Sequence, residues 1–201
     1  YGHLRKAYIE SYRPDLWLAL MASETLYEHC AEIDAACRRR LDLIVPQLAK
    51  TAGATEELKA ADPLKWVGLM NTCKAQAEEI IALGLPTGAR VARLERVRLA
   101  DDTPMALEYS ALPALILPQP ERVEDSLYSH LAAHGHEPVR ALQHIRAANA
   151  TERQAGLLAI PPGQALLFIT RFSYQADERP IEITHTWCRS DYYDFVVELR
   201  R

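Results

Sequence analysis

Hydrophobic and polar positions in the second half of the chain alternate over short segments bounded by turn residues, which is typical of β-strands. Residues 91–100 mix β-branched and long side chains and contain neither Gly nor Pro. Residues 101–103 are turn-forming, and residues 104–110 continue the extended pattern. We therefore predict a β-hairpin around this turn.

The register of this hairpin places two cations and one carboxylate together. A three-residue turn would pair Ala100 with Pro104, and hence Arg96 with Glu108. Side chains alternate between the faces of a strand, so Arg98 lies on the same face as Arg96. Two guanidinium groups at this spacing can bind a phosphate or a carboxylate. The alternative is a set of solvated charges, or a cross-strand ion pair that contributes little stability.

The first half of the chain has the three- and four-residue periodicity of helices. Residues 1–53 carry an apolar stripe formed by Cys30, Ile33, Cys37, Leu41, Ile44 and Leu48. Pro14 fits the first turn of a helix, Pro46 predicts a kink or a stop, and Gly53 predicts a helix end.

A second helical stretch follows a short helical piece at residues 55–61. Asp62 and Pro63 read as an N-cap and a first helical residue. The buried stripe of this helix is expected to contain Trp66, Met70, Cys73, Ala77 and Ile80. Gly84 and Pro86 predict its end.

Two shorter helices are predicted within the strand-rich half. The first opens at Asp125 or Ser126 and closes at Gly135. The second begins with a capping box formed by Thr151 and Gln154.

The remaining segments predict further strands at residues 139–148, 166–174 and 181–188, with a turn at 177–179 and a closing strand at 194–200. The fold class is therefore α+β: a helical N-terminal region followed by a mostly antiparallel sheet with two helices.

Composition narrows the class of protein. The 201 residues have a net charge of −4, so the chain as a whole is not a polyanion binder. No apolar run is long enough for a membrane span, and the chain begins with Tyr, which suggests a fragment. The four cysteines lack close Cys-x-x-Cys spacing and fit reduced thiols of a cytoplasmic protein. We expect no metal or other cofactor.

A helix start beside the arginines would complete an anion site. The backbone N–H groups at the start of a helix and the Ser126 hydroxyl suit a phosphate or carboxylate. The alternative is that Ser126 is only a helix cap.

Several spaced motifs resemble the UTRA domain, the effector-binding domain of GntR-type transcription regulators of the HutC branch. In the hairpin these are Arg-x-Arg, Leu-Ala-Asp, Pro-Met-Ala-Leu-Glu and Leu-Pro, although the family commonly has Gly where this chain has Asp102. Further matches are the Ser-Leu-Tyr at 126–128 and the segments 155–163, 171–182 and 189–195. The resemblance covers residues 83–201.

This resemblance implies a site and partners. The positions that bind the effector in the family correspond here to Arg96, Arg98, Glu108, Ser126 and Glu182, and more loosely to Tyr128 and Tyr174. The implied ligand is a small anionic effector such as a sugar phosphate or a small carboxylic acid. The implied assembly is a homodimer formed through the sheet.

Residues 1–82 resemble TnpV, a small helical protein carried on transposons and conjugative elements. The chain thus reads as two regions, 1–82 and 83–201, joined helix to helix. Compared with complete UTRA domains, this chain is expected to lack the first strand. It is also expected to lack the preceding winged helix-turn-helix, so it would contact DNA only indirectly. Arg38, Arg39 and Arg40 could meet DNA phosphates, or could form a solvated helix face.

Three functions from different classes remain open at this point. The first is a ligand-sensing regulator domain, which stabilisation by a phosphorylated sugar or small acid would support. The second is an enzyme, because UTRA domains share the fold of chorismate lyase. Its sign would be pyruvate release from chorismate, but no nucleophile–base pair or phosphate loop is recognisable. The third is a mobile-element structural or DNA-interaction protein with a UTRA remnant that binds nothing.

Overall fold

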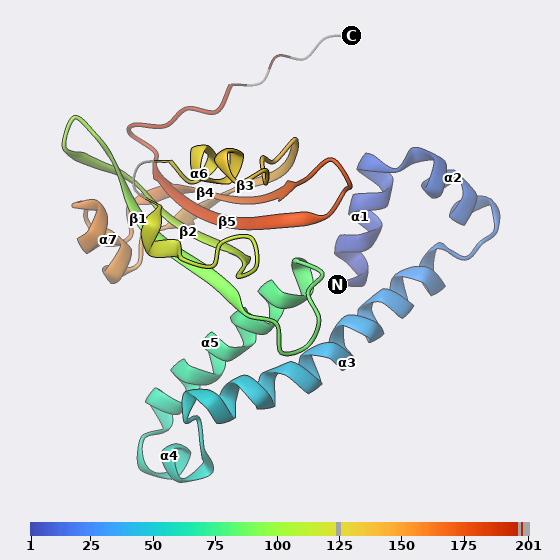
Figure 1. Ribbon diagram of the computed structural model, residues 1–201, viewed down its shortest axis with the longest axis horizontal. Coiled ribbons are helices and arrows are strands. Elements are labelled where there is room, and N and C mark those ends of the chain that lie inside the picture. Colours follow the sequence, from blue (N-terminus) through green and yellow to red (C-terminus); the bar gives the residue numbers. More distant parts are fainter. Residues whose placement is uncertain (124–125, 197, 199–201) are drawn as a thin grey trace. The chain divides into compact units, whose positions relative to one another are not determined.

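The computed structural model describes residues 1–123, 126–196 and 198. The chain forms two compact units (Figure 1). The first contains Tyr1–Ile81 and Pro86–Gly88, and the second contains Ala82–Leu85 and Ala89–Arg201.

The first unit is helical. Its helices are α1 (Gly2–Tyr12), α2 (Pro14–Ala22), α3 (Leu26–Ala52), α4 (Glu56–Ala61) and α5 (Pro63–Ala82). The start of α1 lies directly on α3, because a Cβ atom at Gly2 would be only 2.7 Å from the carbonyl oxygen of Cys30. The N-terminal ammonium group of Tyr1 donates to Asp34 at 2.9 Å.

The predicted helix boundaries in this unit are confirmed, with one exception. Pro14 begins α2, Gly53 ends α3 in the left-handed conformation, and the Asp62 carboxylate accepts from the backbone N–H of Lys65 at the start of α5. Pro46 does not stop α3, which continues to Ala52. The buried residues Ile44 and Ala49 lie on either side of Pro46, so packing on the apolar stripe offsets the missing hydrogen bond.

The second unit is built on a five-stranded antiparallel sheet with strand order β1-β2-β5-β4-β3 (Figure 1). Its strands are β1 (Val91–Ala100), β2 (Thr103–Pro113), β3 (Arg140–Asn149), β4 (Ala165–Tyr174) and β5 (Pro180–Arg189). Its helices are the 3-10 turn η1 (Pro120–Arg122), α6 (Leu127–Ala133) and α7 (Glu152–Leu158). The α+β fold predicted from the sequence is confirmed.

Helices α6 and α7 cover opposite faces of the sheet. Leu127 and Leu131 of α6 pack against Ala92 and Leu112, which lie on one face of the β1–β2 hairpin. The opposite face carries Leu107 and Leu166, which pack against Ala155 and Leu158 of α7. The predicted capping box of Thr151 and Gln154 opens α7.

The β1–β2 hairpin has the predicted register but a different turn. Its turn contains only Asp101 and Asp102, both with positive φ (45° and 64°), as in a type I′ turn. A β-bulge between Arg98 and Leu99 then shifts the register by one residue. The shorter turn and the bulge compensate each other, so Arg96 lies opposite Glu108 as expected.

The end of the chain differs from the sequence-based expectation. Residues 194–196 and 198 are not part of a strand, so the predicted closing strand at 194–200 is wrong there. Its other positions lie outside the described residues, as does Asp125, one of the two candidate helix openings. Ser126, the other candidate, is the N-cap of α6.

The Asp101–Asp102 turn generates a stability prediction. Asp102→Gly removes the steric strain of a side chain at φ 64° and should stabilise the chain by about 0.5–1 kcal/mol. Asp102→Val places a β-branched residue there and should destabilise it by about 1–2 kcal/mol. Urea denaturation of both variants checks the two signs. A stabilising valine would contradict the turn geometry.

Candidate functional site

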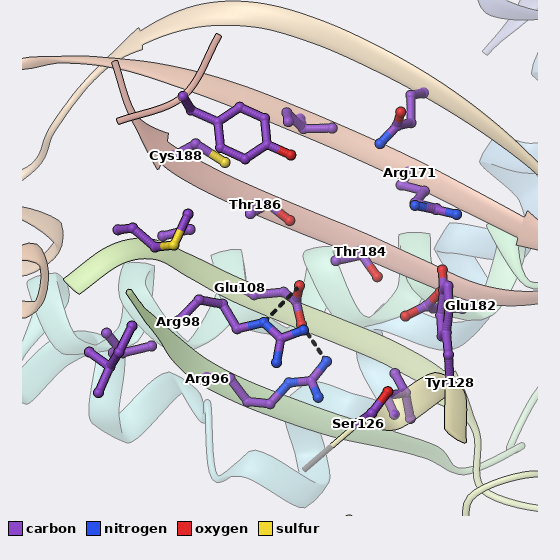
Figure 2. A pocket seen from close by; sticks show the side chains of 18 residues that line it. Arg96, Arg98, Glu108, Ser126, Tyr128, Arg171, Glu182, Thr184, Thr186 and Cys188 are labelled. Atoms are coloured by element: carbon purple, nitrogen blue, oxygen red, sulfur yellow. Dashed lines mark hydrogen bonds and ion pairs between the residues drawn. The ribbon is translucent and has the colours of Figure 1, made fainter. Parts of the chain in front are cut away.

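A pocket with a volume of about 550 Å³ lies on the face of the sheet that α6 partly covers (Figure 2). Its lining is formed by side chains from all five strands, from the start of α6 and from the segment after β5. Volumes of this order are typical of small-molecule sites. The lining residues include Arg96, Arg98, Glu108, Ser126, Tyr128, Gln143, Arg171, Glu182, Thr184, Thr186, Cys188 and Tyr193.

Two arginines of β1 meet one carboxylate of β2 in this pocket (Figure 2). An Nη2 group of Arg96 donates to Oε1 of Glu108, and Nε of Arg98 lies 3.9 Å from Oε2. The side chains of Arg96 and Glu108 are 19% and 15% exposed, whereas Arg98 is 44% exposed. The carboxylate neutralises one of two positive charges and orients both guanidinium groups.

Arg96 retains unused hydrogen-bonding capacity. Its Nε and Nη1 atoms are buried, and neither has a partner among the described residues. A buried donor without an acceptor costs about 1–3 kcal/mol. An anion with several acceptor oxygens would satisfy these donors.

A second polar cluster surrounds Glu182 on β5. This carboxylate is 2% exposed and accepts from the hydroxyl groups of Tyr128 (2.9 Å) and Ser173 (2.8 Å). Burial raises the pKa of Tyr128 to about 12, and the nearby charge of Glu182 adds to the effect. Tyr128 therefore remains a neutral hydrogen-bond donor at physiological pH.

Ser126 lies at the edge of the pocket and caps α6. Its Oγ accepts from the backbone N–H of Ser129 at 3.3 Å, which still leaves the hydroxyl hydrogen free to donate. Helix α6 has only seven residues, so the guanidinium groups contribute most of the positive potential for an anion.

Tyr174 does not join the pocket, although the family resemblance implies that it walls the site. It follows Ser173 on β4 and is absent from the pocket lining, while Ser173 faces Glu182. The guanidinium group of Arg140 lies 4.1 Å from the centre of its ring. The alternation of side chains along β4 explains this correction.

Several lining residues were not among the predicted site residues. Those on the strands with a polar group or a thiol are Gln143, Arg171, Thr184, Thr186 and Cys188. The two-residue period of a strand identifies four of them, because Thr184, Thr186 and Cys188 share a face with Glu182 and Arg171 shares one with Ser173.

The chemistry of the lining favours binding over catalysis. Burial and, to a lesser extent, the Glu108 charge together raise the pKa of the Cys188 thiol to about 11, so the thiol is a poor nucleophile at neutral pH. In the described part of the chain, no group of three or more His, Cys, Asp or Glu side chains could hold a metal ion. All four cysteines are free thiols.

None of the described helices has the length and apolar character needed to cross a membrane.

Comparison with protein families gives two matches. Residues 67–194 match the UTRA domain family, and residues 1–85 match the family described as transposon-encoded protein TnpV. The two matches overlap at residues 67–85, which include most of α5 and the residues that follow it.

Curated relatives are transcription regulators. The chain is 32% identical over 123 residues to the HTH-type transcriptional repressor NagR of Bacillus subtilis. It is also 32% identical over 124 residues to the repressor PhnF of Mycolicibacterium smegmatis. Each alignment covers 59% of this chain and 51% of the relative, so the chain spans about half the length of the curated relatives it matches.

Solved structures show the same fold. The ligand-binding domain of a GntR-family transcriptional regulator from Bordetella bronchiseptica aligns with a TM-score of 0.57 and 28% identity, covering 62% of this chain and 80% of that one. The effector domain of PhnF from Mycobacterium smegmatis aligns with a TM-score of 0.57 and 30% identity, covering 61% and 77%.

The burial of Tyr128 beside Glu182 generates a prediction about alkaline pH. An unfolded tyrosine ionises near pH 10, whereas folded Tyr128 holds its proton to about pH 12. The folded state therefore binds more protons in this window, and stability falls as pH rises through it. Tyr128→Phe lacks this dependence. The gap in urea midpoint between wild type and variant should narrow from pH 9 to pH 11, and a constant gap would contradict the assignment.

Proposed function

Because this chain belongs to the UTRA domain family, the effector-binding domain of GntR-type transcription regulators, we propose that its pocket binds a small anionic effector. A sugar phosphate or a small carboxylic acid has the required chemistry. The observation that carries this proposal is the pair Arg96 and Arg98, since Arg96 has buried donors without a partner in the described chain.

Each lining residue has a role in this proposal. Arg96, Arg98 and the Ser126 hydroxyl hold the anion through charge-assisted hydrogen bonds. Glu108 and Glu182 accept hydrogen bonds from hydroxyl or amine groups on the rest of the ligand. The Tyr128 ring forms a wall, while its hydroxyl group keeps Glu182 in place.

We propose that residues 83–201 do the sensing and that residues 1–82 form a separate TnpV-like region. The domain would act in the cytoplasm as a homodimer formed through its sheet. A ligand that binds one dimer geometry more tightly than another shifts the population toward it. Such a shift would change operator affinity indirectly, through the DNA-binding domain of the whole regulator.

The proposal assigns no catalytic activity to the chain. The pocket arginines and carboxylates suit recognition, and the Cys188 thiol remains protonated. The fold shared with chorismate lyase is an analogy that does not establish an activity.

Isothermal titration calorimetry with a panel of sugar phosphates and small carboxylic acids tests the proposal. We expect micromolar binding of at least one anion by the wild-type chain, and a loss of about tenfold or more in Arg96→Ala, because charge-assisted bonds contribute about 1.5–3 kcal/mol. The control is Arg93→Ala, on the same strand but outside the pocket lining. No binding by a demonstrably folded chain, or equal losses in both variants, would refute the site.

A second candidate function rests on the TnpV match over residues 1–85. In this alternative the helical region contacts DNA or another mobile-element component, and the UTRA domain binds nothing. Arg38 and Arg39 are exposed on α3, although Arg38 forms an ion pair with Asp34 at 2.5 Å. That pairing weakens the case for a phosphate contact.

The second candidate predicts DNA binding that falls steeply with salt. The whole chain would bind a duplex at low ionic strength, and Arg38→Ala with Arg39→Ala would reduce the slope of log K against log salt by about 2. Fluorescence anisotropy with a labelled duplex measures this. We expect no such binding if the chain is only a sensor.

A further inference from the structure

A third arginine, Arg171, lines the pocket on the side opposite Arg96 and Arg98 (Figure 2). It belongs to β4, whereas the other two belong to β1. The anion site proposed above does not use it. Its position therefore indicates what the far end of the ligand contains.

The strand order fixes the separation between these cations. Strands β2 and β5 lie between β1 and β4, so three interstrand spacings separate them. At about 4.8 Å per spacing, the two backbones are about 14 Å apart. The arginines thus enter the pocket from two strands that are not neighbours, and the guanidinium group of Arg171 lies against the ring of Tyr128, whereas those of Arg96 and Arg98 face Glu108. The groups of Arg96 and Arg98 form a first pole of the pocket, and that of Arg171 forms a second.

Arg171 is held in place but has no ion pair within the part of the chain that the structure describes. Its guanidinium group lies 5.3 Å from the centre of the Tyr128 ring, which fixes its orientation. Its Nε atom is buried and has no partner in the described chain. The neighbouring Glu182 directs Oε2 toward the hydroxyl groups of Tyr128 and Ser173 instead.

The charges of the lining favour an acid at this second pole. Three arginines face two glutamates, and Glu108 is already shared by Arg96 and Arg98. A guanidinium group such as that of Arg171, which has no ion pair among the described residues, binds a carboxylate more strongly than a neutral hydroxyl group.

We propose that Arg171 binds a carboxylate at the far end of the effector, so that the ligand is a two-headed acid with a phosphate at the Arg96 pole and a carboxylate at the Arg171 pole. This inference rests on the proposed function. The residues at the second pole are Arg171, Gln143 on the adjacent strand and Thr184 opposite Arg171 on β5. The cavity of about 550 Å³ has room for a ligand of this kind.

Two matched probes test the proposal by isothermal titration calorimetry. Gluconate 6-phosphate and glucitol 6-phosphate have the same open six-carbon chain and the same phosphate, and differ at C1, which is a carboxylate in one and a hydroxymethyl group in the other. We expect wild-type protein to bind gluconate 6-phosphate at least tenfold more tightly.

Variants locate the origin of that preference. Arg171→Met keeps the apolar stem but removes the charge, so it should abolish the preference for gluconate 6-phosphate over glucitol 6-phosphate. Arg171→Lys should retain part of the preference. Arg146→Met is the control, because this exposed arginine on β3 lies outside the pocket lining and its loss removes the same net charge. Arg96→Ala should weaken both probes.

The outcomes separate this inference from the proposed function. Two results would refute the carboxylate site at Arg171 without affecting the anion site at Arg96. One is equal binding of the two probes by wild-type protein, and the other is a preference that persists in Arg171→Met. Failure of both probes to bind folded wild-type protein would overturn the anion site and the second pole together. If Arg171→Met does not fold, the wild-type comparison and Arg171→Lys decide the question.

Discussion

The pocket depends on the cross-strand pair of Arg96 and Glu108. A shift of one residue in the pairing of two strands turns every side chain of one strand to the other face. Such a slip would remove both arginines of β1 from the pocket and would expose the apolar residues that pack against α6. The two-residue turn and the bulge after Arg98 together prevent it, because each alone would give a different register. The function of the site is therefore determined by backbone geometry several residues away from it.

Both carboxylates in the pocket have partners from the chain itself, and this explains how cations and anions share a small volume. Glu108 accepts from arginine, and Glu182 accepts from the hydroxyl groups of Tyr128 and Ser173. Breaking a partly buried ion pair by removing one partner leaves an uncompensated charge, which is destabilising. Among the pocket residues that the structure describes, the buried side-chain atoms without a partner are donors on Arg96 and Arg171. The site is thus organised before a ligand binds. Its unpaired groups are donors, so a ligand must supply hydrogen-bond acceptors.

Much of this organisation is visible in the sequence, and the failures have physical causes. Alternation along the hairpin places Arg96, Arg98 and Glu108 together, and capping residues locate most helices. Of the kink or stop predicted at Pro46, the stop does not occur, because buried residues on both sides of Pro46 keep α3 continuous. The family resemblance implies that Tyr174 lines the pocket, but alternation along β4 places it on the face opposite to that of Ser173, away from Glu182. Periodicity gives the face of β4 on which Arg171 lies, but that this face lines the same pocket as Arg96 and Arg98 depends on strand order, which periodicity alone does not give.

Strand order also explains why this site should discriminate sharply among ligands. A pocket whose buried polar groups need partners discriminates strongly against a ligand that leaves those groups unpaired. An apolar pocket discriminates less strongly against a ligand of the wrong size. Here the buried donors belong to arginines on two strands that are separated by two others. A ligand that satisfies only one pole leaves donors at the other without an acceptor, so the length of the ligand is selected together with its charge. Under the proposed binding mode, the sheet, rather than any single residue, then sets how far apart the two charged groups of the ligand must lie.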